Sequence, residues 1–102
     1  MIKKKTLKSR PVCKVTFEIP PDRFEEADEI ELVGDFTDWD PVPFEQLKSG
    51  KWKLKQDVDQ GGRYEFRYRV KRNGDVQYEN DPDADGFVPN EFGTENGVIE
   101  CS

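Results

Sequence analysis

Long apolar runs are missing from this chain of 102 residues. No stretch of 18 consecutive apolar residues occurs, so we expect no transmembrane helix. The N-terminus is basic but lacks the apolar segment that a secretory signal peptide needs. We therefore expect a cytoplasmic protein.

Histidine is absent, and cysteine occurs only at Cys13 and Cys101. Without an imidazole the chain has no histidine-based metal site and no histidine for acid–base catalysis. We expect both cysteines to be reduced, as is usual in the cytoplasm. A disulfide stays open as the alternative, because the first and last predicted strands can be neighbours in a β-sandwich.

The first ten residues contain no acidic side chain. Their basic residues are Lys3, Lys4, Lys5, Lys8 and Arg10. We expect residues 1–11 to form a solvated, disordered basic tail. Residues 11–102 carry 11 basic and 22 acidic residues, a net charge of −11. Because such an acidic body repels phosphate groups, we expect neither nucleic acid nor a membrane as a partner.

Large apolar residues are scarce. Leu, Ile, Val and Phe make up only 24 of the 102 residues, close to the level of about 20% below which chains tend to be disordered. The 12 aromatic residues, however, occur in short alternating runs. This distribution predicts a folded chain with a thin aromatic core.

Alternation of apolar and polar residues predicts about seven short strands. The clearest is residues 63–71, in which one face carries Tyr64, Phe66, Tyr68 and Val70. The other predicted strands are residues 12–19, 29–35, 44–47, 51–58, 76–79 and 97–101. No helix is predicted, and Asn73-Gly74 is typical of a type I′ hairpin turn. Residues 12–102 are therefore predicted to form a single all-β, immunoglobulin-like antiparallel β-sandwich.

Trp39 lies in a polar segment, residues 35–41 (DFTDWDP), which follows a predicted strand and Gly34. An aromatic ring held on a polar corner is a platform for a flat, hydroxyl-rich ligand such as a sugar ring. The alternative is that Trp39 folds back and caps the end of the sandwich.

Residues farther along the chain can complete such a sugar site. Arg67 offers hydrogen-bond donors from the polar face of its strand, and Tyr78 offers a second platform. The segment with Phe92, Thr94 and Asn96 adds an apolar edge, a hydroxyl and an amide. Taken alone, Arg67 is more often a surface charge, and Tyr78 is more often a strand aromatic in the core. Taken alone, Thr94 and Asn96 are ordinary turn residues.

Residues 81–86 (DPDADG) match the opening half of a calcium-binding EF-hand loop. The match then fails, because the position that requires a bidentate Glu is Phe92 and no helix flanks the segment. Pro82 also removes a backbone donor. We expect an acidic, solvated loop here, with no metal and no other cofactor.

Asp35, Asp38 and Asp40 lie in one predicted loop and could supply a paired acid and base. A glycosidase also needs a deep cleft in which apolar burial raises the pKa of one carboxyl, and a thin sandwich rarely offers one. The sequence contains no nucleophile elbow, phosphate loop or Cys/His pair. We therefore do not expect an enzyme.

Four motifs resemble, in the same order, those of the family 48 carbohydrate-binding modules. These are isoamylase N-terminal-like early-set domains, and the glycogen-binding domain of AMP-activated protein kinase β subunits is similar to them. The motifs are residues 33–39 (VGDFTDW), 62–68 (GRYEFRY), 80–82 (NDP) and 92–96 (FGTEN).

The resemblance implies an early-set β-sandwich that binds α-1,4-glucans such as glycogen, starch or maltooligosaccharides and catalyses no reaction. We expect a free-standing module of this kind. The residues that match the glucan-binding positions of the family are Trp39, Arg67, Tyr78, Phe92, Thr94 and Asn96. The alternative is a protein-interaction domain of the same fold that associates with a glycogen- or starch-metabolising enzyme and has lost its sugar affinity.

Overall fold

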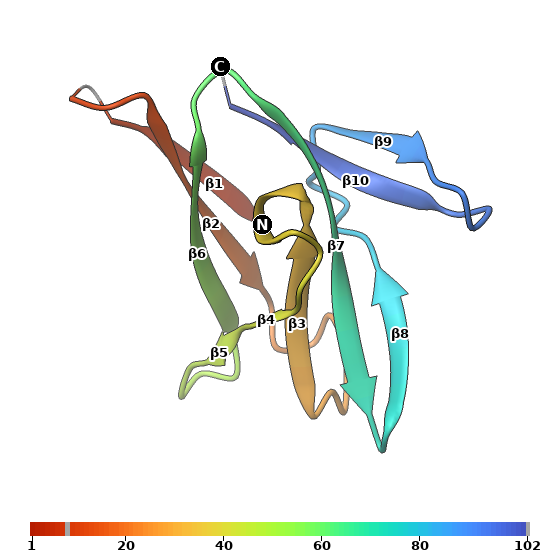
Figure 1. Cartoon of the computed structure of the whole chain (residues 1–102). Coiled ribbons are helices and arrows are strands. Elements are labelled where there is room, and N and C mark those ends of the chain that lie inside the picture. Colours follow the sequence, from red (N-terminus) through yellow and green to blue (C-terminus); the bar gives the residue numbers. More distant parts are fainter. Residues whose placement is uncertain (8, 102) are drawn as a thin grey trace.

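The computed structural model describes residues 1–7 and 9–101, which form two antiparallel β-sheets around one core (Figure 1). The four-stranded sheet has the order β1-β2-β6-β5. Its strands are β1 (Ile2–Thr6), β2 (Val12–Ile19), β5 (Glu45–Gln46) and β6 (Trp52–Asp59). Within the described residues, no helix is long and apolar enough to cross a membrane.

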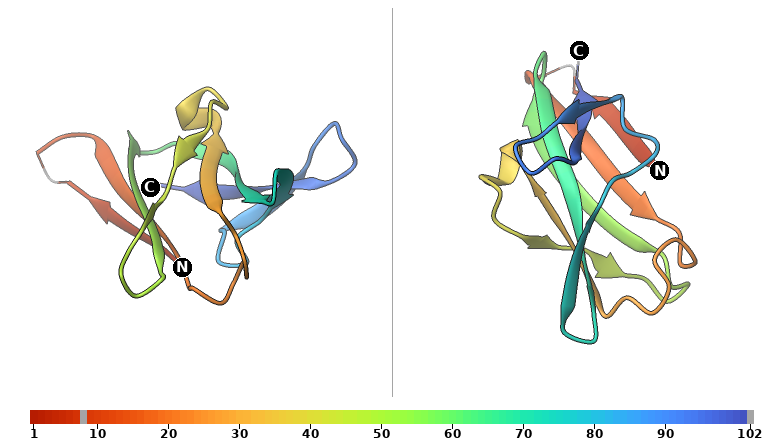
Figure 2. Two further views of the ribbon diagram at one scale, coloured as in Figure 1. Left: turned by 90° about the horizontal axis from the view of Figure 1, so that it is seen from below. Right: turned by 90° about the vertical axis from the view of Figure 1, so that its right-hand side faces the viewer.

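The six-stranded sheet has the order β4-β3-β7-β10-β9, and β8 pairs with β7 beside this path. Its strands are β3 (Glu29–Gly34), β4 (Val42–Pro43), β7 (Arg63–Arg72), β8 (Asp75–Glu79), β9 (Gly86–Pro89) and β10 (Glu95–Glu100). A short 3-10 helix, η1 (Asp35–Thr37), follows β3. Figure 2 shows the β9–β10 hairpin projecting beyond the body of this sheet. The predicted all-β, immunoglobulin-like sandwich is confirmed.

The core is aromatic, as its composition indicates. Phe17 of β2 is fully buried between the sheets, and its ring centroid lies 5.4 Å from that of Phe66 and 6.3 Å from that of Tyr68. Phe66 and Tyr68 alternate along β7 with outward polar residues, so the pleat of the strand itself directs them inward. The opposite face of β7 is consequently free to carry a binding surface.

The N-terminal segment differs from the expectation. Residues 1–11 were predicted to be disordered, but Ile2–Thr6 form β1 and pair with β2 along their whole length. Lys4 holds this strand in place by bonding to the carboxylate of Asp85 and, at 3.0 Å, to the carbonyl of Glu100. Lysines suit an exposed edge strand, because their charge discourages pairing with other chains. Lys8 and Ser102 lie outside the described residues.

Cys13 and Cys101 form a disulfide, with their Cα atoms 6.2 Å apart. The expectation of reduced cysteines is therefore wrong, and the alternative holds. Cys13 points inward from β2, and Cys101 directly follows β10, so the bond joins one sheet to the other. Both residues are buried.

Two more strands lie outside the predicted ones. β4 falls between the predicted strands at residues 29–35 and 44–47, and β9 falls between those at residues 76–79 and 97–101. Both are short edge strands that end in proline, at Pro43 and Pro89. A proline in an edge strand need not interrupt the hydrogen bonds between strands. These prolines therefore argued against strands in the sequence, although they are compatible with short edge strands.

Strand β7 has two different partners along one of its edges, which forms a fork in the six-stranded sheet. On one edge β7 pairs with β3. On the other edge it pairs with β10 through residues 63–66 and with β8 through residues 68–72. Arg67 lies at the point where one partner ends and the other begins.

Candidate functional site

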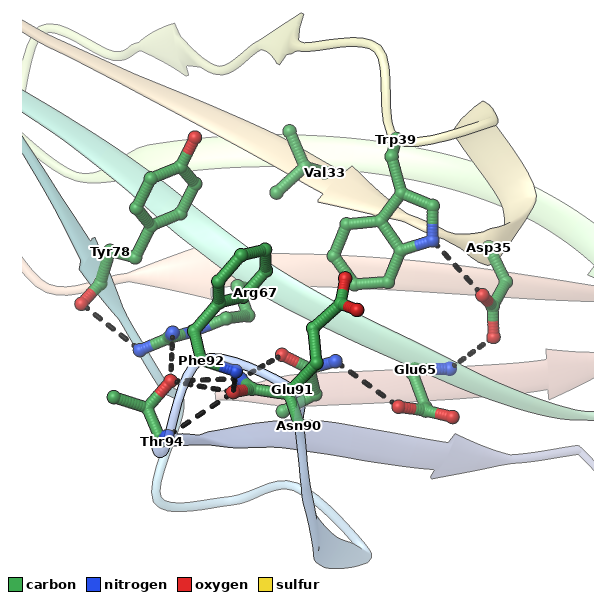
Figure 3. A pocket seen from close by; sticks show the side chains of 11 residues that line it. Val33, Asp35, Trp39, Glu65, Arg67, Tyr78, Asn90, Glu91, Phe92 and Thr94 are labelled. Atoms are coloured by element: carbon green, nitrogen blue, oxygen red, sulfur yellow. Dashed lines mark hydrogen bonds between the residues drawn. The ribbon is translucent and has the colours of Figure 1, made fainter.

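A groove of about 940 Å³ lies over the fork, on the face of the six-stranded sheet that points away from the core. It brings together all of the predicted site residues: Trp39, Arg67, Tyr78, Phe92, Thr94 and Asn96. Figure 3 shows Trp39 on one side of the groove and Tyr78 on the other, with Arg67 and Phe92 between them. Lining residues that we did not assign to a sugar site are Val33, Asp35, Glu65, Asn90 and Glu91.

Trp39 stands open on the corner after β3. Its side chain is 40% exposed, so the alternative in which the ring caps the sandwich is wrong. Asp38 and Trp39 both have left-handed backbone angles (φ 54° and 61°), and the Trp39 N–H donates to the Gly34 carbonyl at 2.9 Å. Gly34 allows β3 to approach β7, because a Cβ there would lie 2.8 Å from the Glu65 carbonyl oxygen.

Asp35 holds the indole in place. Its Oδ1 accepts a hydrogen bond from Trp39 Nε1 at 3.1 Å, and its Oδ2 accepts one from the backbone N–H of Glu65 at 2.8 Å. From the sequence, Asp35 was a candidate only for a paired acid and base. The signal that would have assigned it to the corner is its position four residues before an exposed tryptophan.

Arg67 fills the fork between the two partners of β7. Its Nη1 donates to Thr94 Oγ1 at 3.1 Å, and its Nη2 donates to the Tyr78 carbonyl at 3.2 Å. Its guanidinium carbon lies 5.7 Å from the centroid of the Tyr78 ring, a cation–π contact. Arg67 is thus no unattached surface charge. Both terminal nitrogens keep a second N–H for a ligand, because a guanidinium has five donors.

Two further aromatic side chains border the groove. Tyr78 is 50% exposed on β8, so the core alternative for this residue is wrong. Phe92, at the tip of the loop between β9 and β10, is 80% exposed. Together with Trp39 they give the groove three open apolar surfaces.

Asn90 organises the loop before β10, which carries Thr94, and also bonds to Asn96 near the start of β10. Its Oδ1 accepts from the backbone N–H groups of Phe92 and Thr94 at 3.0 and 3.1 Å. Its Nδ2 donates to Thr94 Oγ1 at 2.8 Å and to Asn96 Oδ1 at 3.1 Å. Asn96 in turn donates to Glu65 Oε1 at 3.1 Å. The signal for Asn90 was an asparagine three residues before Gly93, typical of an Asx turn.

The charge of the groove favours a neutral ligand. Three carboxylates, those of Asp35, Glu65 and Glu91, line it together with the single guanidinium of Arg67. An anionic ligand would be repelled by this excess of negative charge. Hydroxyl groups, in contrast, can donate to carboxylates and accept from Arg67.

The acidic segment that resembles half of a calcium loop is bound to other parts of the fold. Asp81 accepts from the Tyr68 hydroxyl at 2.7 Å and from the Asp83 N–H at 2.8 Å. Burial opposes ionisation of Asp85, but its bonds from Lys4 and the Glu100 N–H hold the pKa of this carboxyl below its usual value. Among residues 1–7 and 9–101, no group of three or more Cys, Asp or Glu side chains is arranged to hold a metal ion.

No family model and no curated protein sequence matches the chain. Solved structures do match its fold. The enterobactin esterase FES from Shigella flexneri has a TM-score of 0.75 and 11% identity, over 98% of this chain and 32% of that one. A pullulanase variant from Paenibacillus barengoltzii in complex with maltotetraose has a TM-score of 0.57 and 27% identity, over 84% of this chain and 13% of that one.

A third match is the catalytic module of SpuA, a glycogen-degrading pneumococcal virulence factor, with a TM-score of 0.63 and 18% identity. It covers 96% of this chain and 16% of that one. The chain thus spans about a third or less of the length of these proteins. Because an esterase and glucan-degrading enzymes share this fold, the fold alone does not select a ligand. The chemistry of the groove has to do so.

Proposed function

We propose that this domain binds α-1,4-glucan chains, such as glycogen, starch or maltooligosaccharides, in the groove and catalyses no reaction on them. The observation that carries the proposal is the gathering of three exposed aromatic side chains around Arg67, Thr94 and Asn96. Sugars present apolar ring faces edged by hydroxyl groups. A site with aromatic surfaces and adaptable donors and acceptors complements both parts of such a ligand.

The expected affinity is modest. A sugar ring that stacks on Trp39 or Tyr78 buries roughly 50–100 Å² of apolar area, which contributes about 1–2.5 kcal/mol at about 25 cal/mol per Å². Each exposed hydrogen bond adds about 0.5–1.5 kcal/mol, and ordering the ligand opposes binding. A net binding free energy of about −4 to −6 kcal/mol corresponds to dissociation constants from about millimolar to tens of micromolar. A polymer with many repeats compensates for such weak single contacts.

Two of the matching structures support the choice of ligand. The pullulanase structure holds maltotetraose, and SpuA is described as glycogen-degrading. In both, the part that matches this chain is a small share of a longer protein. This suggests a second candidate function, in which the same surface docks on a glycogen- or starch-metabolising enzyme. The exposed ring of Phe92 would suit such a protein contact.

A titration with maltoheptaose, followed by amide NMR shifts, tests the proposal. We expect saturable shifts at Trp39, Arg67, Thr94 and Asn96. Trp39→Ala should weaken binding about ten-fold or more, because one stacking surface is lost. Phe87→Ala is the matched control. Phe87 is 43% exposed on β9 but does not line the groove, so its removal should leave affinity unchanged.

The outcome that would contradict glucan binding is an absence of shifts in the native protein at about 10 mM maltoheptaose, above the weakest expected dissociation constant. Equal losses of affinity in Trp39→Ala and Phe87→Ala would contradict this placement of the site. A silent titration together with binding to a glucan-metabolising enzyme would favour the second candidate.

A further inference from the structure

The corner that carries Trp39 contains a carboxylate with two bonds to different parts of the site (Figure 3). Asp35 accepts from the indole Nε1 of Trp39 at 3.1 Å and from the backbone N–H of Glu65 at 2.8 Å. Glu65 lies on β7, two residues before Arg67. One side chain thus connects the exposed indole to the strand that forms the floor of the groove.

The bond to Glu65 falls where β3 stops pairing with β7. The last registered pair of these strands is Gly34 with Phe66, so a continued β3 would place residue 35 opposite Glu65. The chain turns into η1 instead. The Asp35 carboxylate accepts the hydrogen bond from the Glu65 N–H, in place of the backbone carbonyl that a longer β3 would have supplied. The corner is therefore held against the sheet after backbone pairing has ended.

The indole benefits from such a restraint because it is 40% exposed. An exposed side chain that becomes fixed only when a ligand arrives loses rotamer freedom at that moment, which weakens binding. The bond to Asp35 fixes the indole edge beforehand. It also occupies the indole N–H, so Trp39 offers its ring face to a ligand.

We propose that Asp35 is a positioning residue, which fixes the Trp39 indole against β7 and so raises the affinity of the groove for glucan. The inference rests on the proposed glucan site. The proposed role of Asp35 differs from a general structural role, because Asp35 affects glucan affinity by fixing the orientation of one side chain, the indole of Trp39. The orientation of that side chain can be followed apart from the stability of the fold.

Asp35→Ala removes both acceptors. We expect the affinity for maltoheptaose to fall about three- to ten-fold, the effect of one net hydrogen bond. We also expect the Nε1–H NMR signal of Trp39 to shift and its hydrogen to exchange faster with water. Trp52, which is 6% exposed in the core, supplies the internal reference, and its indole signal should stay in place.

Two variants complete the test. Asp40→Ala removes an exposed carboxylate of the same corner that does not line the groove, so we expect native affinity and a native Trp39 signal. Asp35→Asn keeps one acceptor oxygen, so we expect an affinity between those of the native protein and Asp35→Ala.

Native affinity in Asp35→Ala would overturn the inference. So would an affinity loss accompanied by displacement of the Trp52 signal, because that pattern marks a general loss of structure. If the native protein itself binds no maltoheptaose, the proposed glucan function fails, and the role of Asp35 in glucan affinity fails with it. The native titration therefore separates the two failures.

Discussion

The two tryptophans of this chain occupy opposite surroundings. Trp52 begins β6 and is 6% exposed, whereas Trp39 follows η1 and is 40% exposed. Trp52 belongs to a regular ladder with β2, and the pleat directs it into the core. Trp39 is placed by a left-handed turn and a hydrogen bond to Asp35. Packing holds the first ring, and polar contacts hold the second.

The same contrast extends to the other aromatic residues. Core rings contact one another, as Phe17 and Phe66 do at 5.4 Å between centroids. At the groove, the ring of Tyr78 faces the guanidinium of Arg67, and Phe92 is 80% exposed. One set of aromatic side chains therefore stabilises the sandwich, and the other remains available to a ligand. Changes to the two sets should have separable effects.

Truncation of the buried tryptophan should have the largest effect on stability. We expect Trp52→Ala to lower the free energy of unfolding by about 3–5 kcal/mol, because it leaves a cavity between the sheets. Trp39→Ala should change it by less than about 0.5 kcal/mol, as a surface substitution does. Urea unfolding of both variants measures the difference. Similar losses in the two variants would show that Trp39 belongs to the core after all.

Reduction of the disulfide should also affect stability without affecting ligand affinity. The Cys13–Cys101 bond closes a segment with a sequence separation of 88 and joins the two sheets, so its loss should lower stability by about 2–4 kcal/mol. Neither cysteine lines the groove. The reduced protein, where still folded, should therefore keep its affinity for maltoheptaose. Urea unfolding and titration with and without reductant test both parts, and a lower affinity in folded, reduced protein would contradict them.

The smallest expected effect comes from the hydroxyl of Tyr68 in the core. Burial, reinforced by the charge of Asp81, raises the pKa of Tyr68 well above its usual value. The stability that the neutral hydroxyl provides is fully present below about pH 10, the pKa in the unfolded chain, and is lost as pH rises through the folded-state pKa. We expect the loss to approach about 1.4 kcal/mol per pH unit above pH 10.

Tyr68→Phe isolates this contribution. At neutral pH the variant should be less stable by about 1–2 kcal/mol, because buried Asp81 loses a donor. Between about pH 9 and 11 the difference in the free energy of unfolding between native and variant protein, measured by urea unfolding, should become smaller. A gap that stays constant over this range would mean that the hydroxyl is not protected by burial.

Regular alternation was enough to predict the central strands of both sheets. In β7 inward and outward residues differ in kind, so the pattern identified the face with Phe66, Tyr68 and Val70 as buried. It also predicted the hairpin at Asn73 and Gly74, whose φ angles of 48° and 85° fit a type I′ turn. It did not reveal β1, because Lys3, Lys4 and Lys5 give no alternation of apolar and polar residues. β1 pairs with the next strand, β2, and Lys4 bonds to Asp85 from a distant part of the sequence.

The candidate site shows a similar limit. Its six residues were predicted from their side-chain chemistry and from motif resemblance, and the fold brings all of them to one groove. The side chains that arrange them, Asp35 and Asn90, were not assigned to the site from the sequence. Their roles follow from hydrogen bonds to a left-handed corner and to a loop, and such geometry leaves little trace in the hydrophobic pattern.

The fork at Arg67 divides the floor of the groove into two parts. β8 belongs to one part and the loop before β10 to the other, and the Arg67 guanidinium donates a hydrogen bond to each. A ligand lying across the groove would contact both parts and the Arg67 guanidinium between them. Backbone pairing with β7 places β8 and β10, and the Arg67 guanidinium adds one hydrogen bond to each side of the gap between them. An Arg67 substitution would therefore remove a side-chain link across the floor of the groove as well as hydrogen-bond donors for a ligand.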